Sequence, residues 1–535
     1  MTLGIVLSAA FIVVLDNSIL NVAIPTILRD FHTDLPSVQW VVTGYALTFA
    51  SLLIIGGRLG DLYGHRRIFI IGAALFGVGS LLASVSWSVG SLILGEAIIE
   101  GIGASLMLPA TLAIISNTFQ GAERGLAFAG WGTTAGAAAA FGPLVGGFLT
   151  TEYSWRWAFR INVIIAPLAI LGALLVMRRT APAAPRRPRL DMTGAALIAS
   201  GMFLLVFALS EGATYGWFRP VKDFSVVGAR VWPASRPVSI TPLIFVAAAV
   251  ILTAFYRLER RKERDNRGPL FAFGQLRILT FRYGLLTTML LAMGQLGLLF
   301  VLPIFLQEGR HLSAETNGLW VLPTGLFIVI GAQLGGRLTR RVGTTAVART
   351  GLVLETIGLV FVAFVVSPHL SFFELLPGFA CYGFGIGFAS SQLTNVVLSA
   401  IEPEEAGAAS GANTTVRQIG SALGVAVIGS VVTSETIRRA VPAVRAAELS
   451  HVVKEQAVAR LHALGPNFAP PRLATPHEVV TLERIVASAV SGATQPALLF
   501  AAAVVGAGAA LSLLIPRIGP PVEIENLEAL ELVDA

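Results

Sequence analysis

The sequence predicts an all-α polytopic membrane protein with fourteen transmembrane helices, and three observations support this fold class. Of the 535 residues, 55% are hydrophobic and only 13% are charged, whereas soluble globular chains carry about 25% charged residues. Apolar stretches recur along the chain, and each approaches the roughly 20 residues that cross a bilayer as a helix. Two short motifs also recur. This composition excludes an ordinary cytosolic enzyme, a disordered chain and a nucleic-acid-binding protein.

The expected membrane spans follow one another along most of the chain. The first apolar run has neither a basic n-region nor a small-residue cleavage site, so we expect it to remain as a helix and not to be removed as a signal peptide. The spans are expected at residues 3–25, 38–57, 68–89, 91–116, 126–150, 158–177, 192–212, 239–256, 283–306, 318–336, 350–367, 372–400, 408–432 and 495–515.

Lysine and arginine are distributed unevenly between alternate connections. If the N-terminus is cytoplasmic, 22 of the 38 basic residues lie in the inside connections and the C-terminal tail. The short outside loops hold only eight. The positive-inside rule therefore predicts a multi-pass protein of the cytoplasmic membrane with both termini in the cytoplasm. The single cysteine, Cys381, excludes an intramolecular disulfide.

Two motifs indicate an internal duplication. GRLGDLYG at residues 57–64 recurs as GRLTRRVG at 336–343, and GWGTT at 130–134 recurs as GANTT at 411–415. The two motifs recur at nearly the same offset, which predicts two six-helix bundles in the same orientation with two inserted helices between them. The expected units are an N-terminal bundle (1–178), a cytoplasmic linker (179–191), the inserted helices (192–257), a second cytoplasmic linker (258–282), a C-terminal bundle (283–432 and 495–516), an extracytoplasmic loop (433–494) and a cytoplasmic tail (517–535).

Four motifs carry a resemblance to a known family. They are residues 57–67 between the second and third spans, 142–147 in the fifth, 15–25 in the first and 413–420 in the thirteenth. Over nearly its full length the chain resembles the 14-helix drug:proton antiporter family (EmrB/QacA-type) of the major facilitator superfamily. This resemblance implies the MFS fold and export in exchange for protons. The family's helix 4 motif has an arginine where this chain has Ala97, so that arginine's role in proton coupling does not transfer.

Acidic residues inside apolar spans are the first candidate site. An ionised Asp16 in the middle of a span costs on the order of 3 kcal/mol unless it binds a proton or a cation, or finds a partner. The alternative is a carboxylate held by Asn17 and Asn21 as part of helix packing. Glu96 and Glu100 share one helical face, and two adjacent carboxylates in an apolar interior should not both ionise. Alternatively, Glu96 is solvated and only Glu100 is buried.

Arg417 is the single basic residue deep in a span of the second half. It either neutralises a carboxylate of the first half or satisfies carbonyl groups of packed helices. For Glu355 and Glu211 we favour a packing or interface role. The residues expected to couple protons or bind substrate are Asp16, Asn17, Glu96, Glu100 and Arg417.

A charged turn and a small-residue motif are the candidates for gating and helix packing. In the turn, Asp61 and the neighbouring arginines form a salt bridge that holds one access state closed. Alternatively, the arginines only set the orientation of the chain in the membrane. Arg340 replaces Asp61 in the second repeat, which disfavours a symmetric latch. The expected gating residues are Gly57, Arg58, Asp61, Gly64, Arg66 and Arg67. The resemblance makes Gly142, Pro143, Gly146 and Gly147 an antiporter motif, although small residues also simply allow close helix packing.

The chain contains no P-loop, no zinc-binding spacing and no nucleophile triad. We therefore expect no enzyme activity, no cofactor and no metal site, and an ion gradient as the source of energy. The predicted function is proton-coupled efflux of lipophilic cationic compounds by alternating access. The expected partners are a small-molecule substrate, protons and membrane lipid, without nucleic acid, and the chain is expected to be a monomer. The alternatives are a dedicated exporter of one natural product or metabolite and, less favoured, a membrane-embedded enzyme or sensor.

Overall fold

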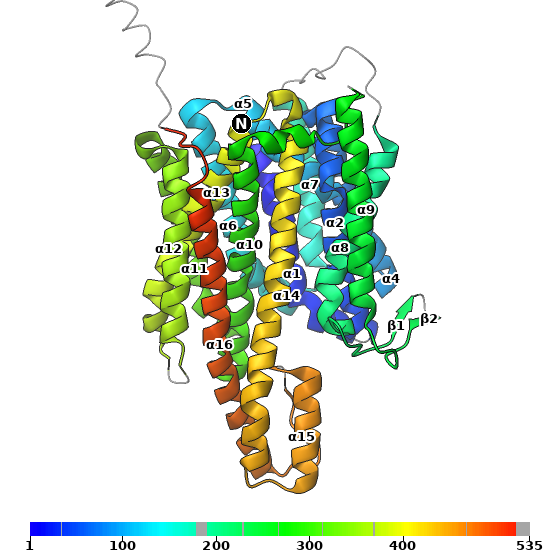
Figure 1. Ribbon diagram of the computed structural model, residues 1–535, viewed down its shortest axis with the longest axis vertical. Coiled ribbons are helices and arrows are strands. Elements are labelled where there is room, and N and C mark those ends of the chain that lie inside the picture. The colour runs from blue at the N-terminus through cyan, green and yellow to red at the C-terminus, as the bar shows by residue number, and fades with distance from the viewer. Residues whose placement is uncertain are drawn as a thin grey trace, which may run out of the picture.

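The computed structural model is a long bundle of helices (Figure 1). It describes residues 1–33, 35–177, 190–226, 229–265, 267–312, 314–367, 370–466 and 468–519. Most of the expected linker 179–191 and of the expected tail 517–535 lies outside the described residues. The side chains of several helical positions, among them Asn17, Asn21 and Pro143, also lie outside them.

In the described residues the first half of the chain contains five candidate membrane spans and the long helix α6. α1 packs on α6 and α7, while α3 packs on α5 and α7. α4, the π-helical η1 and α5 follow without a break and make one span. The bounds are α1 Thr2–Phe31, α2 Leu35–Tyr63, α3 His65–Ser84, α4 Val89–Leu92, η1 Ile93–Glu100, α5 Gly101–Thr118, α6 Gly121–Glu152 and α7 Trp157–Val176.

Two inserted helices join the halves. α8 packs against α9, and it also contacts α2 of the first half and α14 of the second. A two-stranded antiparallel hairpin connects α8 to α9. The bounds are α8 Met192–Tyr215, β1 Phe224–Val226, β2 Ala229–Trp232, α9 Ile240–Arg264 and the short 3-10 helix η2 Phe273–Arg277.

The second half repeats the arrangement of the first. α10 packs on α14 and α16, and α12 packs on α13 and α16. The bounds are α10 Leu279–Ile304, η3 Phe305–Gly309, α11 Ala314–Val342, α12 Thr344–Val365, α13 Phe372–Ser399, η4 Pro403–Glu405, α14 Ala406–Ala446, α15 His451–Leu464 and α16 Pro476–Ser512.

The membrane-spanning character predicted from the sequence is confirmed. Thirteen helical segments of the described residues are long and apolar enough to cross a membrane. The remaining expected span, 126–150, lies within α6, a long helix that packs between α1 and α11. Every expected span thus coincides with a helix or, around η1 and η3, with a run of helical turns.

The segment 433–494, expected as an extracytoplasmic loop, is largely helical in its described residues. α14 continues to Ala446, α15 follows, and α16 begins at Pro476. Figure 1 shows these helices projecting beyond the rest of the bundle, at the end away from the N-terminus. Side chains such as Val444, Leu461 and Val486 are buried in a small core of the projection itself, and this core stabilises the helices outside the bundle.

Equivalent glycines in the two halves make equivalent close contacts between helices. A Cβ atom at Gly79 on α3 would lie 2.6 Å from the backbone nitrogen of Glu100. A Cβ atom at Gly358 on α12 would lie 2.5 Å from the backbone nitrogen of Tyr382. These two glycines are separated by the same offset as the two copies of the repeated loop motif. Glycine lets neighbouring helices approach at equivalent places in both halves.

Candidate functional site

Three carboxylates from distant parts of the sequence meet inside the first half. Asp16 lies in the middle of α1, and Glu96 and Glu100 lie on η1. One carboxylate oxygen of each lies within 4.8 Å of those of the other two. The exposed fractions are 2% for Asp16 and 0% for both glutamates. The structure therefore brings together the three acidic residues that the sequence singled out, and Glu96 is buried together with Glu100.

The π-helical turn η1 and its glycines position the two glutamates. A Cβ atom at Gly95 would lie 2.8 Å from the backbone nitrogen of Ala83 on α3. Gly79 makes the reciprocal approach from α3 to Glu100. Because neither contact leaves room for a side chain, η1 lies directly against α3. Short π-helical turns inside α-helices frequently occur at functional sites.

Asn162 on α7 completes the cluster, although the sequence did not identify it as a site residue. Its amide nitrogen donates to Asp16 Oδ1 at 2.7 Å and to Glu100 Oε1 at 3.2 Å. Asn162 is fully buried. The available signal was a lone amide in an apolar span, since polar side chains inside a membrane usually face a partner or a functional site.

The charge balance of the cluster determines its chemistry. Asp16 Oδ2, Glu100 Oε2 and both carboxylate oxygens of Glu96 are buried, and within the described part of the chain the side chains that Glu96 meets are the other two carboxylates. The ion pairs of the described part of the chain include none with these three side chains. Three negative charges at such distances repel one another strongly in an apolar interior. The cluster is therefore suited to hold protons or a cation.

Arg417 on α14 belongs to a separate polar group in the second half. It donates to Gln295 Oε1 at 3.3 Å and to Ser390 Oγ at 3.1 Å. Gln295 also donates to Ser390 at 2.8 Å. Glu355 on α12 is fully buried nearby and interacts electrostatically with Arg417. The described contacts of Arg417 are thus with side chains of its own half.

One residue of this second polar group stands at the position equivalent to Asp16. Gln295 follows Asp16 at the offset that separates the two copies of the repeated loop motif. The equivalent position in the second half therefore carries a neutral amide in place of a carboxylate. The two halves are related in architecture but differ in charge at the corresponding site.

Asp61 connects the two halves at one end of the bundle. Its carboxylate accepts hydrogen bonds from the backbone nitrogens of Gly407 at 2.7 Å and Ala408 at 2.8 Å, in the first turn of α14. A helix N-terminus attracts negative charge because its amide groups lack partners within the helix. A Cβ atom at Gly57 would lie 2.0 Å from the carbonyl oxygen of Gly407. Only glycine permits this approach of α2 to α14.

The other residues expected to act in gating lie in or beside the connection between α2 and α3. Gly64 has φ of 91°, a conformation that favours glycine. Arg66 donates to the backbone carbonyls of Ala173 and Leu174 at the end of α7, while Arg67 is exposed and Arg58 is half-buried. In the described residues Asp61 pairs with His65 and with α14, and forms no ion pair with these arginines. The contact that Asp61 makes between the halves is therefore that of a carboxylate with the N-terminus of a helix.

Further hydrogen bonds cross between the halves near Asp61. Asn117 donates to the carbonyl of Pro403 at 3.3 Å, and Gln392 donates to the carbonyl of Gly125 at 3.4 Å. Gly125 also lies against the buried Thr339 on α11. We call this region, with Asp61, Thr339 and the start of α14, the Asp61 end of the bundle. The two halves are in contact there.

The small-residue motif of α6 packs against α1 close to Asp16. A Cβ atom at Gly142 would lie 2.3 Å from Ser18 Cβ, and one at Gly146 would lie 3.1 Å from the Cα atom of Ile19. Gly147 has no atom within 4 Å of such a Cβ position. Two of the expected glycines thus allow close packing of α6 beside the carboxylate cluster, whereas Gly147 does not.

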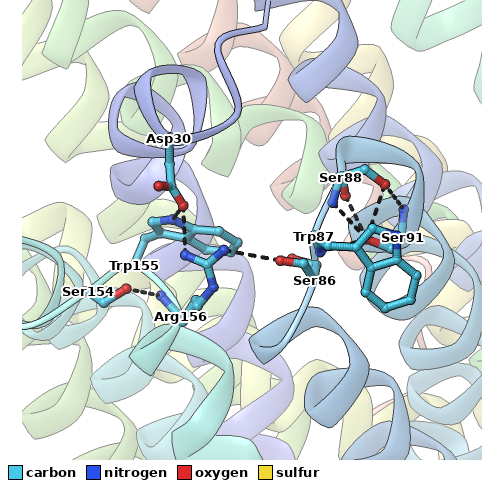
Figure 2. Close-up of polar contacts among 8 residues, drawn as sticks. All are labelled: Asp30, Ser86, Trp87, Ser88, Ser91, Ser154, Trp155 and Arg156. Atoms are coloured by element: carbon cyan, nitrogen blue, oxygen red, sulfur yellow. Dashed lines mark hydrogen bonds and ion pairs between the residues drawn. The ribbon is translucent and has the colours of Figure 1, made fainter.

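An ion pair holds the far end of α1. Asp30 accepts from Arg156 Nη1 at 2.6 Å and from the indole nitrogen of Trp155 at 3.0 Å (Figure 2). Arg156 also donates to the carbonyl of Ser86 at 3.1 Å. The hydrogen bond from Arg156, reinforced by that from Trp155, holds the pKa of Asp30 below its usual value. These contacts join α1 to α7 and to the α3–α4 connection.

A helical membrane protein with two related halves and buried carboxylates has the features of a secondary transporter. The chain belongs to the Major Facilitator Superfamily, whose family model matches residues 6–425. This assignment confirms the resemblance stated from the motifs, and members of this superfamily are transporters.

Relatives and a solved structure agree with this assignment. The chain is 34% identical to a probable actinorhodin transporter of Streptomyces coelicolor, covering 80% of this chain and 72% of the relative. It is 33% identical to a puromycin resistance protein of Streptomyces alboniger (81% and 82%) and 30% identical to the multidrug resistance protein Stp of Mycobacterium tuberculosis (85% and 81%). The crystal structure of the human organic anion transporter MFSD10 has a similar fold, with TM-score 0.58 at 14% identity over 95% of this chain and 98% of that one.

Proposed function

We propose that this protein exports lipophilic, cationic compounds across the cytoplasmic membrane in exchange for protons. The observation that carries the proposal is the buried cluster of Asp16, Glu96 and Glu100, which has no basic partner among the described residues. Such a cluster holds protons in one state and a positively charged substrate in another, so that one displaces the other. The names of the relatives, which are exporters and resistance proteins, support efflux as the direction.

In the proposed cycle the two halves rock about the cluster. The contacts of Asp61 with α14 hold the Asp61 end closed, and opening that end requires them to break. The basic connections lie at this end, which supports placing it, with both termini, in the cytoplasm. In this cycle the protein acts as a monomer, because each chain carries its own pair of halves.

A second candidate is the export of one natural product. Two relatives are named for single compounds, as an actinorhodin transporter and as a tetracenomycin C resistance and export protein. The relative Stp is named for multidrug resistance. A panel of cationic dyes and of neutral or anionic natural products, tested in cells that express the chain, separates a broad range from a single substrate.

Transport in inverted membrane vesicles tests the proton coupling. With an imposed proton gradient, the native protein should accumulate an ethidium-like dye, and a protonophore should abolish the accumulation. Asp16→Asn and Glu100→Gln should each abolish transport while the protein remains folded, because each removes a carboxylate of the cluster. Glu402→Gln, at an exposed position, is the matched control and should transport normally. Unchanged transport in both cluster variants would refute the assignment of coupling to these residues.

A further inference from the structure

The oxygens of the cluster lie close enough to one another to share a metal ion. One carboxylate oxygen from each of Asp16, Glu96 and Glu100 lies within 4.8 Å of the other two. Oxygens that share a calcium ion bind at about 2.3–2.6 Å, so two of them are at most about 5 Å apart. Calcium takes about 6–8 oxygen ligands in a flexible geometry, whereas magnesium keeps several of its waters and is seldom enclosed by protein oxygens alone. Three buried carboxylates that converge in this way therefore suit a calcium-sized ion better than magnesium.

Two neutral side chains offer further oxygens at the same place. Asn162 is fully buried with its amide directed at Asp16 and Glu100, and its carbonyl oxygen has no partner among the described residues. A rotation of the amide plane would turn this oxygen toward the carboxylates. The fully buried Ser80 hydroxyl on α3 lies beside Glu100. Carboxylates, amide carbonyls and hydroxyls are the hard oxygen donors that calcium prefers.

The charge of the cluster also favours a divalent ion. The basic residue deep in the other half, Arg417, is engaged with Gln295 and Ser390. Within the described part of the chain, no lysine, arginine or histidine bonds to Asp16, Glu96 or Glu100. A dication would neutralise two of the three negative charges at once. We propose that Asp16, Glu96 and Glu100, with Asn162 and Ser80, form a binding site for a calcium-sized divalent cation.

Occupancy by the ion has a consequence for transport, and this consequence rests on the proposed function. An ion held by all three carboxylates occupies the oxygens that would otherwise bind protons or substrate. Calcium that reaches the cluster should therefore inhibit proton-driven export. The binding itself is measurable without any transport assay.

Equilibrium binding of radioactive calcium to the purified full-length protein in lipid nanodiscs tests the site. The native protein should bind one ion per chain saturably, and magnesium should compete only at a much higher concentration. Glu96→Gln should weaken binding about tenfold or more, and Asn162→Ala should weaken it by a smaller factor. Glu355→Gln is the matched control, because Glu355 is equally buried but lies in the other half.

The outcomes separate this inference from the proposed function. Two results would overturn the metal site even if dye transport persists. One is that the native protein does not bind calcium saturably. The other is that the Glu96→Gln and Asp16→Asn variants bind calcium as well as the native protein does. Calcium binding that depends on Glu96, in a protein without proton-driven transport, would support the metal site and refute the antiport. Gel filtration and thermal denaturation of each variant distinguish loss of the site from loss of folding.

Discussion

Asn162 is the residue that ties the carboxylate cluster together. It carries no charge, yet one amide nitrogen donates to side chains from two different spans, Asp16 on α1 and Glu100 on η1. Hydrogen bonds to charged groups contribute about 1.5–3 kcal/mol each when their partners are buried. A lone asparagine in α7 therefore positions two acidic residues that lie far apart in the sequence.

Asp30 provides a prediction about pH. The pKa of Asp30 is lowered chiefly by its hydrogen bond from Arg156, so it lies below the value of about 3.9 that an unfolded chain has. The pair therefore stabilises the fold above about pH 4, and its contribution is lost as the pH falls through the folded-state pKa. Both side chains are partly exposed, so the effect should be below about 1 kcal/mol. Asp30→Asn should lower the melting temperature at pH 7, as measured by thermal denaturation in detergent.

The difference between this variant and the native protein should close as the pH falls through the lowered folded-state pKa of Asp30, where this carboxylate becomes protonated in the native chain. Glu402→Gln, at an exposed position without this partner, is the control. A difference that stays constant through the whole acid titration would mean that the ionised Asp30 does not stabilise the fold.

At the scale of the element, η1 distinguishes the fourth span from an ordinary helix. Its π-helical turn carries Glu96 and Glu100, and Gly95 within it and Gly79 on α3 allow the two helices to approach. Residues four apart remain near one another in a wider turn, so the shared face expected from the sequence persists. Close packing against α3 fixes where this face points.

Gly79→Ala should disrupt this packing. The added Cβ atom would lie 2.6 Å from the backbone nitrogen of Glu100, so η1 must shift and the glutamates with it. Overpacking of this kind costs about 1–3 kcal/mol. We expect a lower melting temperature and a marked loss of dye transport. Gly147→Ala is the control, since its Cβ atom meets no atom within 4 Å, and equal behaviour of the two variants would contradict the packing argument.

The contact between α2 and α14 is the second element with a predicted function. Asp61→Asn should weaken the two hydrogen bonds to the start of α14, because an amide oxygen accepts less strongly than a carboxylate. The loss should favour opening of the Asp61 end. A cysteine substitution, Thr339→Cys in a Cys381→Ser background, places a buried thiol there. Its reaction with a maleimide should be about tenfold faster in the Asp61→Asn variant.

Glu404→Gln is the control for this experiment, because Glu404 is exposed close to the start of α14, and the hydrogen bonds that hold Asp61 there come from Gly407 and Ala408. It should leave the labelling rate unchanged. Equal labelling rates for the native sequence and Asp61→Asn would show that the contact does not hold this end closed.

At the scale of the whole molecule, two similar halves surround chemistry that is not duplicated. One hydrophobic core runs from the first half through the inserted helices to buried residues of the second half such as Phe281, Val397 and Ala409, and another lies within the second half. The halves meet along α2 with α14 and along α6 with α11. The carboxylates gather in the first half, while Gln295 and Arg417 lie in the second. A duplicated scaffold with different polar groups supports movement of one half against the other around a single charged cluster.

The distribution of basic residues predicts the orientation of the whole molecule. In a Cys381→Ser background, Val452→Cys places a thiol on the exposed surface of α15, and Glu402→Cys places one at the Asp61 end. In intact cells a membrane-impermeant maleimide should label the first and not the second. Permeabilised cells, in which both should react, provide the control. Labelling of Glu402→Cys alone in intact cells would reverse the proposed orientation.

The sequence by itself determined the class of fold, the order of the spans and the duplication. These follow from hydrophobic length and repeated motifs, which are local properties of the chain and need no knowledge of packing. Asp16, Glu96 and Glu100 were also identified from the sequence, because an acidic residue in an apolar span is costly wherever it points. The helices within 433–494 bury a small core of their own, and that core depends on packing and not on hydrophobic length.

Only the tertiary structure decided which side chains meet. The addition of Asn162 to the cluster, the attachment of Asp61 to the start of α14, and the engagement of Arg417 within its own half depend on how helices far apart in sequence approach one another. Side-chain volume and glycine contacts set that approach, and hydrophobic patterning does not encode it. The sequence thus determined that buried charge is present, and the packing of the helices decided where that charge gathers.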